Sequence, residues 1–152
     1  MGAALEREII RRYFEDAAGD PRLLGDLVHD DVVLNGGQPG SWAGCLPVPY
    51  TPPDTLRLIA YTNSSLDILH NLVSAVIAAF PDWRSSVQDV LVEGQQVAVR
   101  VSGSGTHTGQ GFPGIPERAR VTSTGLAWLR LSHGKIAEIW TIWERGEPSV
   151  PE

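Results

Sequence analysis

The stretches VQDVLVEGQQVAVRVSGSGTHT (residues 87–108) and ARVTSTGLAWLRLSHGKIAEIWTIWE (residues 119–144) decide the fold. Apolar residues alternate with polar ones along them, which is typical of strands that are buried on one side only. Glu-Gly-Gln at 93–95 and Ser-His-Gly-Lys at 132–135 supply turns between neighbouring runs. The pattern therefore predicts an antiparallel sheet with strands over residues 87–93, 96–108, 119–131 and 136–144.

Apolar residues at three- and four-residue steps predict helices in the first half of the chain. Leu5, Tyr13 and Ala17 share one apolar face, and Gly19-Asp20-Pro21 ends that helix. Helices that precede a run of antiparallel strands indicate an α+β domain, with the helices on one face of a curved sheet and an apolar cavity between them. The expected elements are helices over residues 4–18, 21–28 and 54–79, with a break near 63–65 as an option for the last, and a short strand over 32–34.

Length and composition restrict the class of protein. A chain of 152 residues predicts one domain, residues 1–152, with a core of its own. The net charge of −6 without a basic stripe argues against nucleic acid as a partner. No apolar run is long enough to cross a bilayer, and the charged residues near the start do not fit a signal peptide, so we expect no membrane. The single Cys45 fits a reducing cytoplasm.

Residues 35–53 form a segment without periodicity that contains four Gly and five Pro. Long irregular segments inside a compact domain are uncommon and are often lids or binding loops. Trp42 and Tyr50 favour such a role, since a solvated linker has little use for aromatic side chains. An irregular surface loop anchored by these aromatics is the alternative. Trp42 is the candidate substrate contact of this segment.

Several short motifs recur in one order and spacing along the chain. They are Phe80-Pro81-Asp82, Gly105-Thr106-His107-Thr108-Gly109, Gly114-Ile115-Pro116 and Gly134-Lys135-Ile136-Ala137-Glu138-Ile139-Trp140, with Glu8-Ile9-Ile10-Arg11-Arg12 and Gly19-Asp20 near the start. Together they resemble the SnoaL-like polyketide cyclases of the nuclear-transport-factor-like superfamily. The likeness covers nearly the whole chain except residues 35–53.

The resemblance implies a cone-shaped barrel of a curved, mostly antiparallel sheet with helices packed on its concave side. It also implies a pocket that needs no cofactor, and a homodimer through the outer face of the sheet. The best-understood members of the family close a ring by intramolecular aldol chemistry, using an Asp on the last strand and a His on the strand before it. These positions fall on Thr141 and Ala127 here. Neither side chain titrates near neutral pH, so acid–base catalysis cannot proceed from these two places.

A third family position lies on the first helix and usually holds an aromatic residue. In this chain that residue is Asp16. A carboxylate on a pocket wall would be partly desolvated, and its pKa would rise towards a useful range. Asp16 is therefore a candidate catalytic group, although a solvated carboxylate at a helix edge is the alternative. Leu72 is the corresponding pocket position on the long helix.

Strand alternation assigns the two faces of the sheet. If Thr141 faces inward, so do Ile139 and Trp143, while Trp140, Ile142 and Glu144 face outward. The same parity puts Ser123, Gly125, Ala127 and Leu129 inside, and Thr122, Thr124 and Trp128 outside. Trp128 and Trp140 would be unfavourable in water, which supports a dimer interface on the outer face. The predicted substrate contacts are Tyr13, Trp42, Asn63, Leu72, Ala127, Leu129, Ile139 and Trp143.

His107 lies in the Gly-x-His-x-Gly motif, where it is either structural or a third catalytic candidate beside Asp16 and Thr141. The four His and the acidic residues have no metal-ligand spacing, so no metal is expected. The segment 103–114 is not a phosphate loop, because no Lys-Ser or Lys-Thr pair and no helix follow it.

The leading hypothesis is a cofactor-independent cyclase or isomerase of natural-product biosynthesis that folds a hydrophobic, polyketide-type small molecule in an apolar pocket. Such an enzyme would depend on substrate positioning and a few hydrogen-bond donors. An epoxide hydrolase or epoxide-opening cyclase is an alternative, and it requires a second acid near Asp16, for which Asp31 or Glu144 would have to turn inward. A non-catalytic protein that binds a hydrophobic small molecule is the second alternative.

Overall fold

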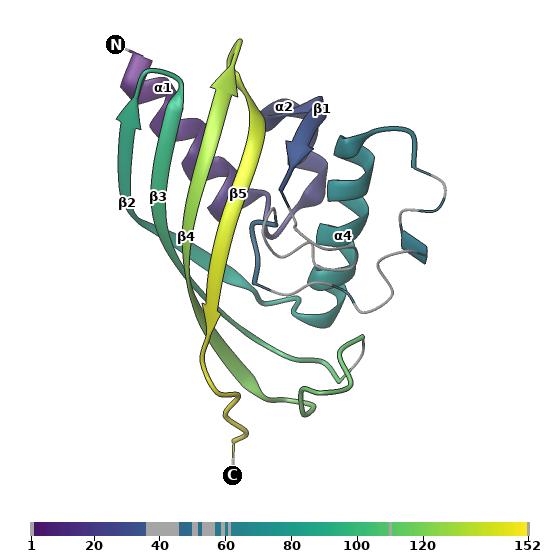
Figure 1. The fold of residues 1–152 in the computed structure, drawn as a ribbon. Helices are drawn as coiled ribbons and strands as arrows, with labels where there is room; N and C mark the ends of the chain where they lie inside the picture. The colour runs from purple at the N-terminus through teal and green to yellow at the C-terminus, as the bar shows by residue number, and fades with distance from the viewer. Residues whose placement is uncertain are drawn as a thin grey trace.

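Strand β4 (Arg120–Ser132) is the central strand of a five-stranded sheet in the order β1-β5-β4-β3-β2 (Figure 1). The computed structural model describes residues 2–35, 46–49, 52, 57–58, 60, 62–109 and 111–151. β5 (Lys135–Arg145) and β3 (Gln96–Thr106) pair with β4 antiparallel, and β2 (Arg84–Glu93) pairs with β3 in the same sense. β1 (Val28–Leu34) lies parallel to β5. The predicted α+β fold with a mostly antiparallel sheet is confirmed.

Tight turns join the neighbouring strands where the sequence predicts them. His133 and Gly134, between β4 and β5, have φ angles of 51° and 79°. Positive φ at both central residues is the requirement of the two-residue hairpin turns that match strand twist. Gly94 between β2 and β3 also has a positive φ, of 61°. Both turns fix the register of the strands that they connect.

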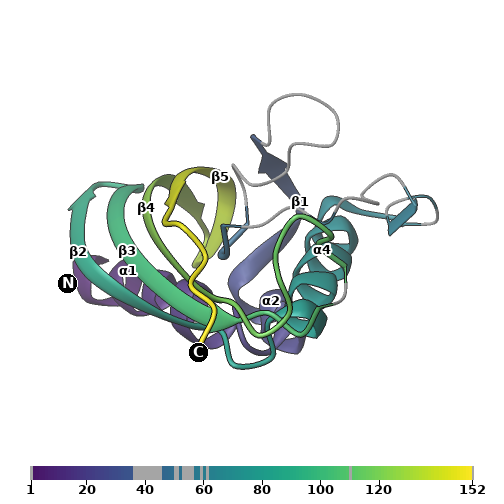
Figure 2. The same ribbon diagram turned by 90° about the horizontal axis from the view of Figure 1, so that it is seen from below.

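The helices lie along one side of the curved sheet (Figure 2). The first helix is α1 (Gly2–Arg11), which continues into a π-helical turn, η1 (Arg12–Asp16). The other helical elements are η2 (Pro21–Leu23), α2 (Leu24–Leu27) and α4 (Ser65–Ala79). The predicted positions hold for these helices. Helix α4 begins at Ser65, where the sequence suggests a break in the helical region 54–79. The strand expected over 32–34 is longer and begins at Val28.

Local sequence explains where α4 begins. The Ser64 Oγ accepts a hydrogen bond from the Asp67 backbone N–H at 3.1 Å, which is an N-cap. Asp67 lies in the first turn, where a negative charge is stabilised by the helix dipole. Phe80 ends the helix, and Pro81 after it cannot continue the helical hydrogen bonding.

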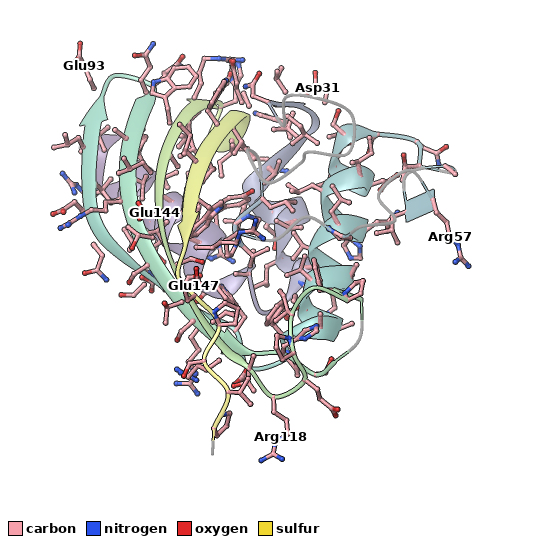
Figure 3. All side chains as sticks on the ribbon, turned by 60° about the horizontal axis from the view of Figure 1, so that its bottom comes forward. Asp31, Arg57, Glu93, Arg118, Glu144 and Glu147 are labelled. Atoms are coloured by element: carbon pink, nitrogen blue, oxygen red, sulfur yellow. The ribbon has the colours of Figure 1, made fainter. Side chains whose placement is uncertain are left out.

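Alternate residues of the sheet are buried against the helices. Along β4, every second residue from Val121 to Leu131 is buried, while Thr122, Thr124, Leu126 and Trp128 are exposed. Strand residues point to opposite faces in turn, so one face contributes to the core and the other meets solvent. Charged side chains such as Glu93 and Arg118 lie at the periphery of the molecule (Figure 3).

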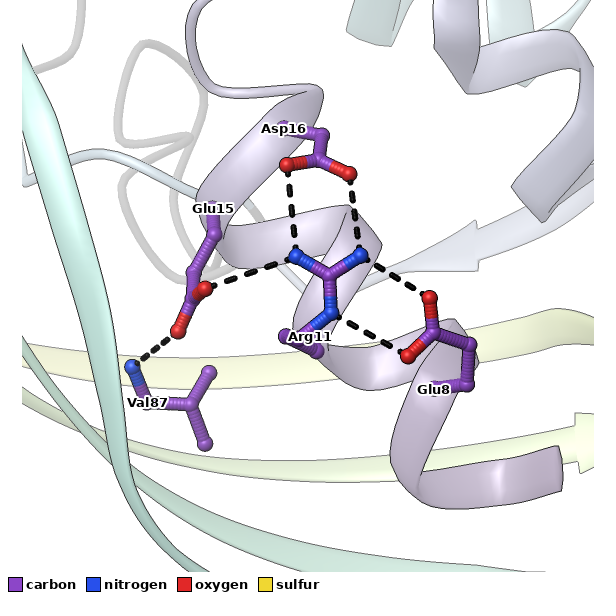
Figure 4. Close-up of polar contacts among 5 residues, drawn as sticks. All are labelled: Glu8, Arg11, Glu15, Asp16 and Val87. Carbon is purple, nitrogen blue, oxygen red and sulfur yellow. Dashed lines mark hydrogen bonds and ion pairs between the residues drawn. The ribbon is translucent and has the colours of Figure 1, made fainter. Parts of the chain in front are cut away.

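A carboxylate ties the first helix to the sheet at a β-bulge. β2 has one extra residue between Val87 and Asp89 relative to β3. The Val87 backbone N–H at this bulge donates to the Glu15 carboxylate at 2.8 Å, and Arg11 holds the other Glu15 oxygen at 3.5 Å (Figure 4). Glu15 lies in the π-helical turn, which the apolar pattern did not predict. The turn buries Tyr13 and Phe14 together and leaves the Glu15 carboxylate against β2.

Replacing Glu15 tests this link. Glu15→Ala leaves the Val87 N–H without its partner, so the free energy of unfolding should fall by about 1–3 kcal/mol, measured by urea denaturation. Glu8→Ala is the control, since Glu8 also pairs with Arg11 but its side chain is 54% exposed. Equal midpoints for Glu15→Ala and the wild type would contradict the structural role of this hydrogen bond.

Candidate functional site

The inner face of β4 and β5 is an apolar surface opposite the helices. Ala127 pairs with Thr141 and Leu129 pairs with Ile139 across the two strands. All four are buried, and the two apolar residues of the second pair are fully so. The alternation that the sequence predicts for these strands is therefore present. Tyr13 and Leu72, from the helical side, belong to the same buried cluster.

Thr141 is a polar residue in this apolar surface. It is 3% exposed, and its Oγ1 has no hydrogen-bond partner among the described residues. Burying a hydroxyl without a partner costs roughly 1–3 kcal/mol, so such groups in folded proteins generally have one. A hydroxyl can donate one hydrogen bond and accept two. The Thr141 hydroxyl is therefore a buried donor and acceptor without a partner among the described residues, and it cannot exchange a proton near neutral pH.

Trp143 lies next to Thr141 on the same face, against a glycine. A Cβ placed on Gly125, its partner on β4, would lie 2.8 Å from two carbons of the indole ring. The absence of a side chain at Gly125 thus lets the ring lie close to the strand. The indole N–H donates to the backbone oxygen of Leu46 at 3.3 Å. Trp143 therefore connects the sheet to the Pro-rich segment.

Part of that segment lies inside the molecule. Residues 46–49 are all buried, and Leu46 and Val48 belong to the core cluster of the sheet and helices. These four residues therefore pack in the core, while the choice between a lid and a surface loop for the whole of residues 35–53 stays a prediction. Trp42, predicted as a substrate contact, lies outside the described residues.

The surroundings of Asp16 differ from the expected pocket wall. Its carboxylate accepts hydrogen bonds from both terminal nitrogens of Arg11, at 3.2 and 3.4 Å, and its side chain is 40% exposed (Figure 4). Arg11 also binds Glu8 at 2.8 Å. These hydrogen bonds, with Glu8 first and Asp16 second, raise the pKa of Arg11, and the bond to Arg11 lowers the pKa of Glu8. The carboxylate is thus part-buried and paired with a cation that the sequence did not reveal, and a catalytic role for Asp16 stays a prediction.

His107 directly follows the end of β3, and Asn63 precedes α4. His107 is 1% exposed and packs against Phe80 and Phe112, with ring centroids 5.1 and 6.1 Å apart. Its Nδ1 lies 3.4 Å from the Pro116 oxygen, so the ring supports the turn between β3 and β4. Asn63 is exposed just before the cap of α4. A catalytic role for His107 and a substrate contact for Asn63 stay predictions.

A second acid near Asp16 would be needed for epoxide chemistry. Asp31 and Glu144, the two candidates from the sequence, are both exposed, and Glu144 lies on the outer side of β5 (Figure 3). The carboxylates beside Asp16 are Glu8 and Glu15, which share its Arg11. The Arg11 guanidinium thus binds three carboxylates. None of the three is a free partner with which Asp16 could hold a water molecule.

The described parts of the chain contain no group of three or more His, Cys, Asp and Glu side chains that could hold a metal ion. Within the same parts, no helix has the length and apolar character needed to cross a membrane.

The family model of SnoaL-like polyketide cyclases matches residues 60–147, more than half of the chain. The protein therefore belongs to the SnoaL-like polyketide cyclase family, as the motifs predict. No protein of curated function matches the sequence significantly.

Solved structures share the fold at low sequence identity. TsrD from Streptomyces laurentii is 19% identical, with a TM-score of 0.66 over 93% of this chain and 89% of TsrD. IdmH from Streptomyces antibioticus is 24% identical, with a TM-score of 0.62 over 92% of this chain and 91% of IdmH. A SnoaL-like polyketide cyclase from Agrobacterium tumefaciens is 18% identical, with a TM-score of 0.62 over 91% of this chain and 90% of that protein. At these identities the likeness establishes the cone-shaped fold.

Sequence reasoning missed two features of this site. One is the burial of residues 46–49, for which the apolar Leu46 and Val48 between prolines were the available signal. The other is Arg11, whose spacing of four residues from Glu15 is a known helix ion-pair spacing. Its contact with Asp16, five residues away, depends on the π-helical turn and had no signal in the sequence.

Gly125→Ala tests the close contact beneath Trp143. The added methyl would overlap the indole ring, so we expect a loss of about 1–3 kcal/mol in the free energy of unfolding and a shifted tryptophan emission maximum. Gly25→Ala in α2 is the matched control, because a Cβ there meets nothing within 4 Å. A Gly125→Ala protein as stable as the control would show that the ring does not need this space.

Proposed function

We propose that this protein is a cofactor-independent cyclase or isomerase that acts on a polyketide-type natural-product intermediate in the cytoplasm. The observation that carries the proposal is the buried, unpartnered hydroxyl of Thr141 within the apolar inner face of β4 and β5. The family supports a reaction of this class. The apolar surroundings favour a hydrophobic substrate with few polar groups.

The proposed catalysis depends on positioning rather than on proton transfer from the sheet. An apolar surface that holds two parts of one molecule together raises their effective concentration, which can supply much of the barrier of an intramolecular reaction. Thr141 would donate its hydroxyl to a carbonyl oxygen of the substrate and stabilise negative charge that develops there. In apolar surroundings such a bond is stronger than in water.

Asp16 takes a smaller part in this proposal than the sequence suggested. Two hydrogen bonds to Arg11 occupy its carboxylate. The ion pair would have to open before Asp16 could accept a proton from a substrate. We therefore propose a ring closure or pericyclic step that needs no strong base, with Trp143, Ala127, Leu129 and Ile139 shaping the substrate.

Thr141→Val tests the proposed role of the hydroxyl. Valine has nearly the same shape, so stability should be kept while turnover falls on the order of a hundredfold through the loss of one donor. The measurement is the conversion of polyketide-type intermediates by the purified wild type and each variant. Asp16→Asn is the comparison and should keep turnover within about twofold of the wild type. Full turnover by Thr141→Val would remove Thr141 from the mechanism, and loss of turnover in Asp16→Asn would restore Asp16 to it.

A binding protein without catalysis is the second candidate. It is favoured by the absence of a titratable group at Thr141 and Ala127, where cyclases that close rings by aldol chemistry carry theirs. Mass spectrometry of the protein after incubation with polyketide-type intermediates separates the two. Unconverted ligand would support binding alone, and a rearranged product would support catalysis.

We also propose that the protein forms a homodimer through the outer face of the sheet. Trp128, Trp140, Leu126 and Ile142 are 36%, 46%, 61% and 65% exposed, and they line one apolar hollow of about 500 Å³. A patch of this kind on β4 and β5 is unusual for a surface in contact with water. A second copy of the same face would cover these side chains with apolar ones.

Ile142→Glu tests the dimer. A charge in the centre of this patch would have to be buried without a partner, so the protein should become monomeric in sedimentation experiments while its circular dichroism is kept. Leu5→Glu is the control, since Leu5 is 56% exposed on α1, away from the patch. A wild-type protein that is monomeric at micromolar concentration would contradict the proposal.

A further inference from the structure

Ser123 is a second buried hydroxyl on the inner face, one inward position beyond Gly125. It is 6% exposed, and its Oγ has no hydrogen-bond partner among the described residues. Its partner on the neighbouring strand β3 is Gly103, and the next inward residue on β4 is Gly125. Glycines therefore flank Ser123 on two sides. Gly103 also lies against an indole, that of Trp83, which a Cβ on this glycine would overlap.

Neither indole can satisfy Ser123. The Trp83 N–H donates to the Ser85 Oγ at 2.8 Å, and the Trp143 N–H donates to the Leu46 oxygen at 3.3 Å. Both N–H groups are therefore committed to other acceptors. Ser123 is therefore a polar residue between Gly103 and Gly125. The Trp83 ring packs on the first glycine and the Trp143 ring on the second.

A buried hydroxyl that does nothing for the fold is unfavourable, because alanine would fit the same place without loss of hydration. Thr141 has the same property on the other side of Trp143. We propose that Ser123 determines substrate specificity by binding a second oxygen of the substrate whose first oxygen binds Thr141. This inference depends on the proposed function, in which the inner face of β4 and β5 holds the substrate.

Strand geometry defines the class of substrate. Thr141 pairs with Ala127, which is four residues from Ser123 along β4. At about 3.3 Å per residue the two hydroxyls are roughly 13 Å apart along the strand. The Trp143 ring lies between them and close to Gly125, so it offers an aromatic surface for stacking. The site therefore suits a mainly apolar molecule that carries two oxygens at about this separation.

Stability distinguishes a ligand-binding hydroxyl from a structural one. Ser123→Ala should keep or raise the Tm of the ligand-free protein, because it removes a buried group without a partner. Ser85→Ala is the matched control: it is a serine in the same row of the sheet, its Oγ accepts the Trp83 N–H, and its loss should lower the Tm. A fall in Tm for Ser123→Ala as large as that for Ser85→Ala would overturn the inference.

Binding of two probes tests the specificity directly. Anthraflavic acid is a flat three-ring diketone with a hydroxyl at each end, and the second probe is the anthraquinone that keeps only one of these hydroxyls. By quenching of tryptophan fluorescence, the wild type should bind the first probe roughly threefold to tenfold more tightly than the second. Ser123→Ala should bring this ratio near one and leave the affinity for the second probe unchanged, while Ser85→Ala should keep the ratio.

The outcomes separate this inference from the proposed function. If the wild type binds both probes and Ser123→Ala does not change their ratio, the role of Ser123 is wrong and the apolar site stands. If the wild type binds neither probe, both the site and the role of Ser123 are overturned.

Discussion

The pairing of β4 with a strand on each side is the constraint on which the rest of the structure depends. Its register with β3 is continuous from Gln96 opposite Arg130 to Thr106 opposite Arg120. A shift of one residue would exchange the buried and exposed faces of the whole strand, so this register fixes which side chains enter the interior. The helices, the Leu46–Pro49 segment and the proposed substrate site are all placed against that inner face.

Glycine and tryptophan act together on this face. Gly125 and Gly103 leave room for the rings of Trp143 and Trp83 to approach the strands closely. The Trp143 N–H donates a hydrogen bond to the Leu46 oxygen, and the Trp83 N–H donates one to the Ser85 Oγ. The result is an aromatic and apolar sheet surface on which the hydroxyls of Ser123 and Thr141 have no hydrogen-bond partner among the described residues. Such a surface can orient a hydrophobic substrate, but it offers no acid or base.

The charged groups of the first helix serve the fold. Arg11 gathers Glu8, Glu15 and Asp16, and Glu15 in turn binds the Val87 N–H at the bulge of β2. The π-helical turn Arg12–Asp16 makes this cluster possible. Its wider turn brings residues five apart, such as Arg11 and Asp16, onto the same side of the helix. Asp16, a catalytic candidate from its place in the sequence, is one member of this ion-pair cluster, and its catalytic role stays a prediction.

The sequence by itself determined the strands, their turns and their inner and outer faces, because a period of two residues and residues that tolerate positive φ are local properties. It also identified the family, and the resemblance predicts that Thr141 and Ala127 stand at the usual catalytic positions. Only the tertiary structure decided the partners of the polar groups: the Arg11 of Asp16, the aromatic packing of His107, and the absence of any partner at Ser123 and Thr141 among the described residues. Partners of this kind depend on contacts between segments far apart in the chain, on which the periodicity of one segment carries no information.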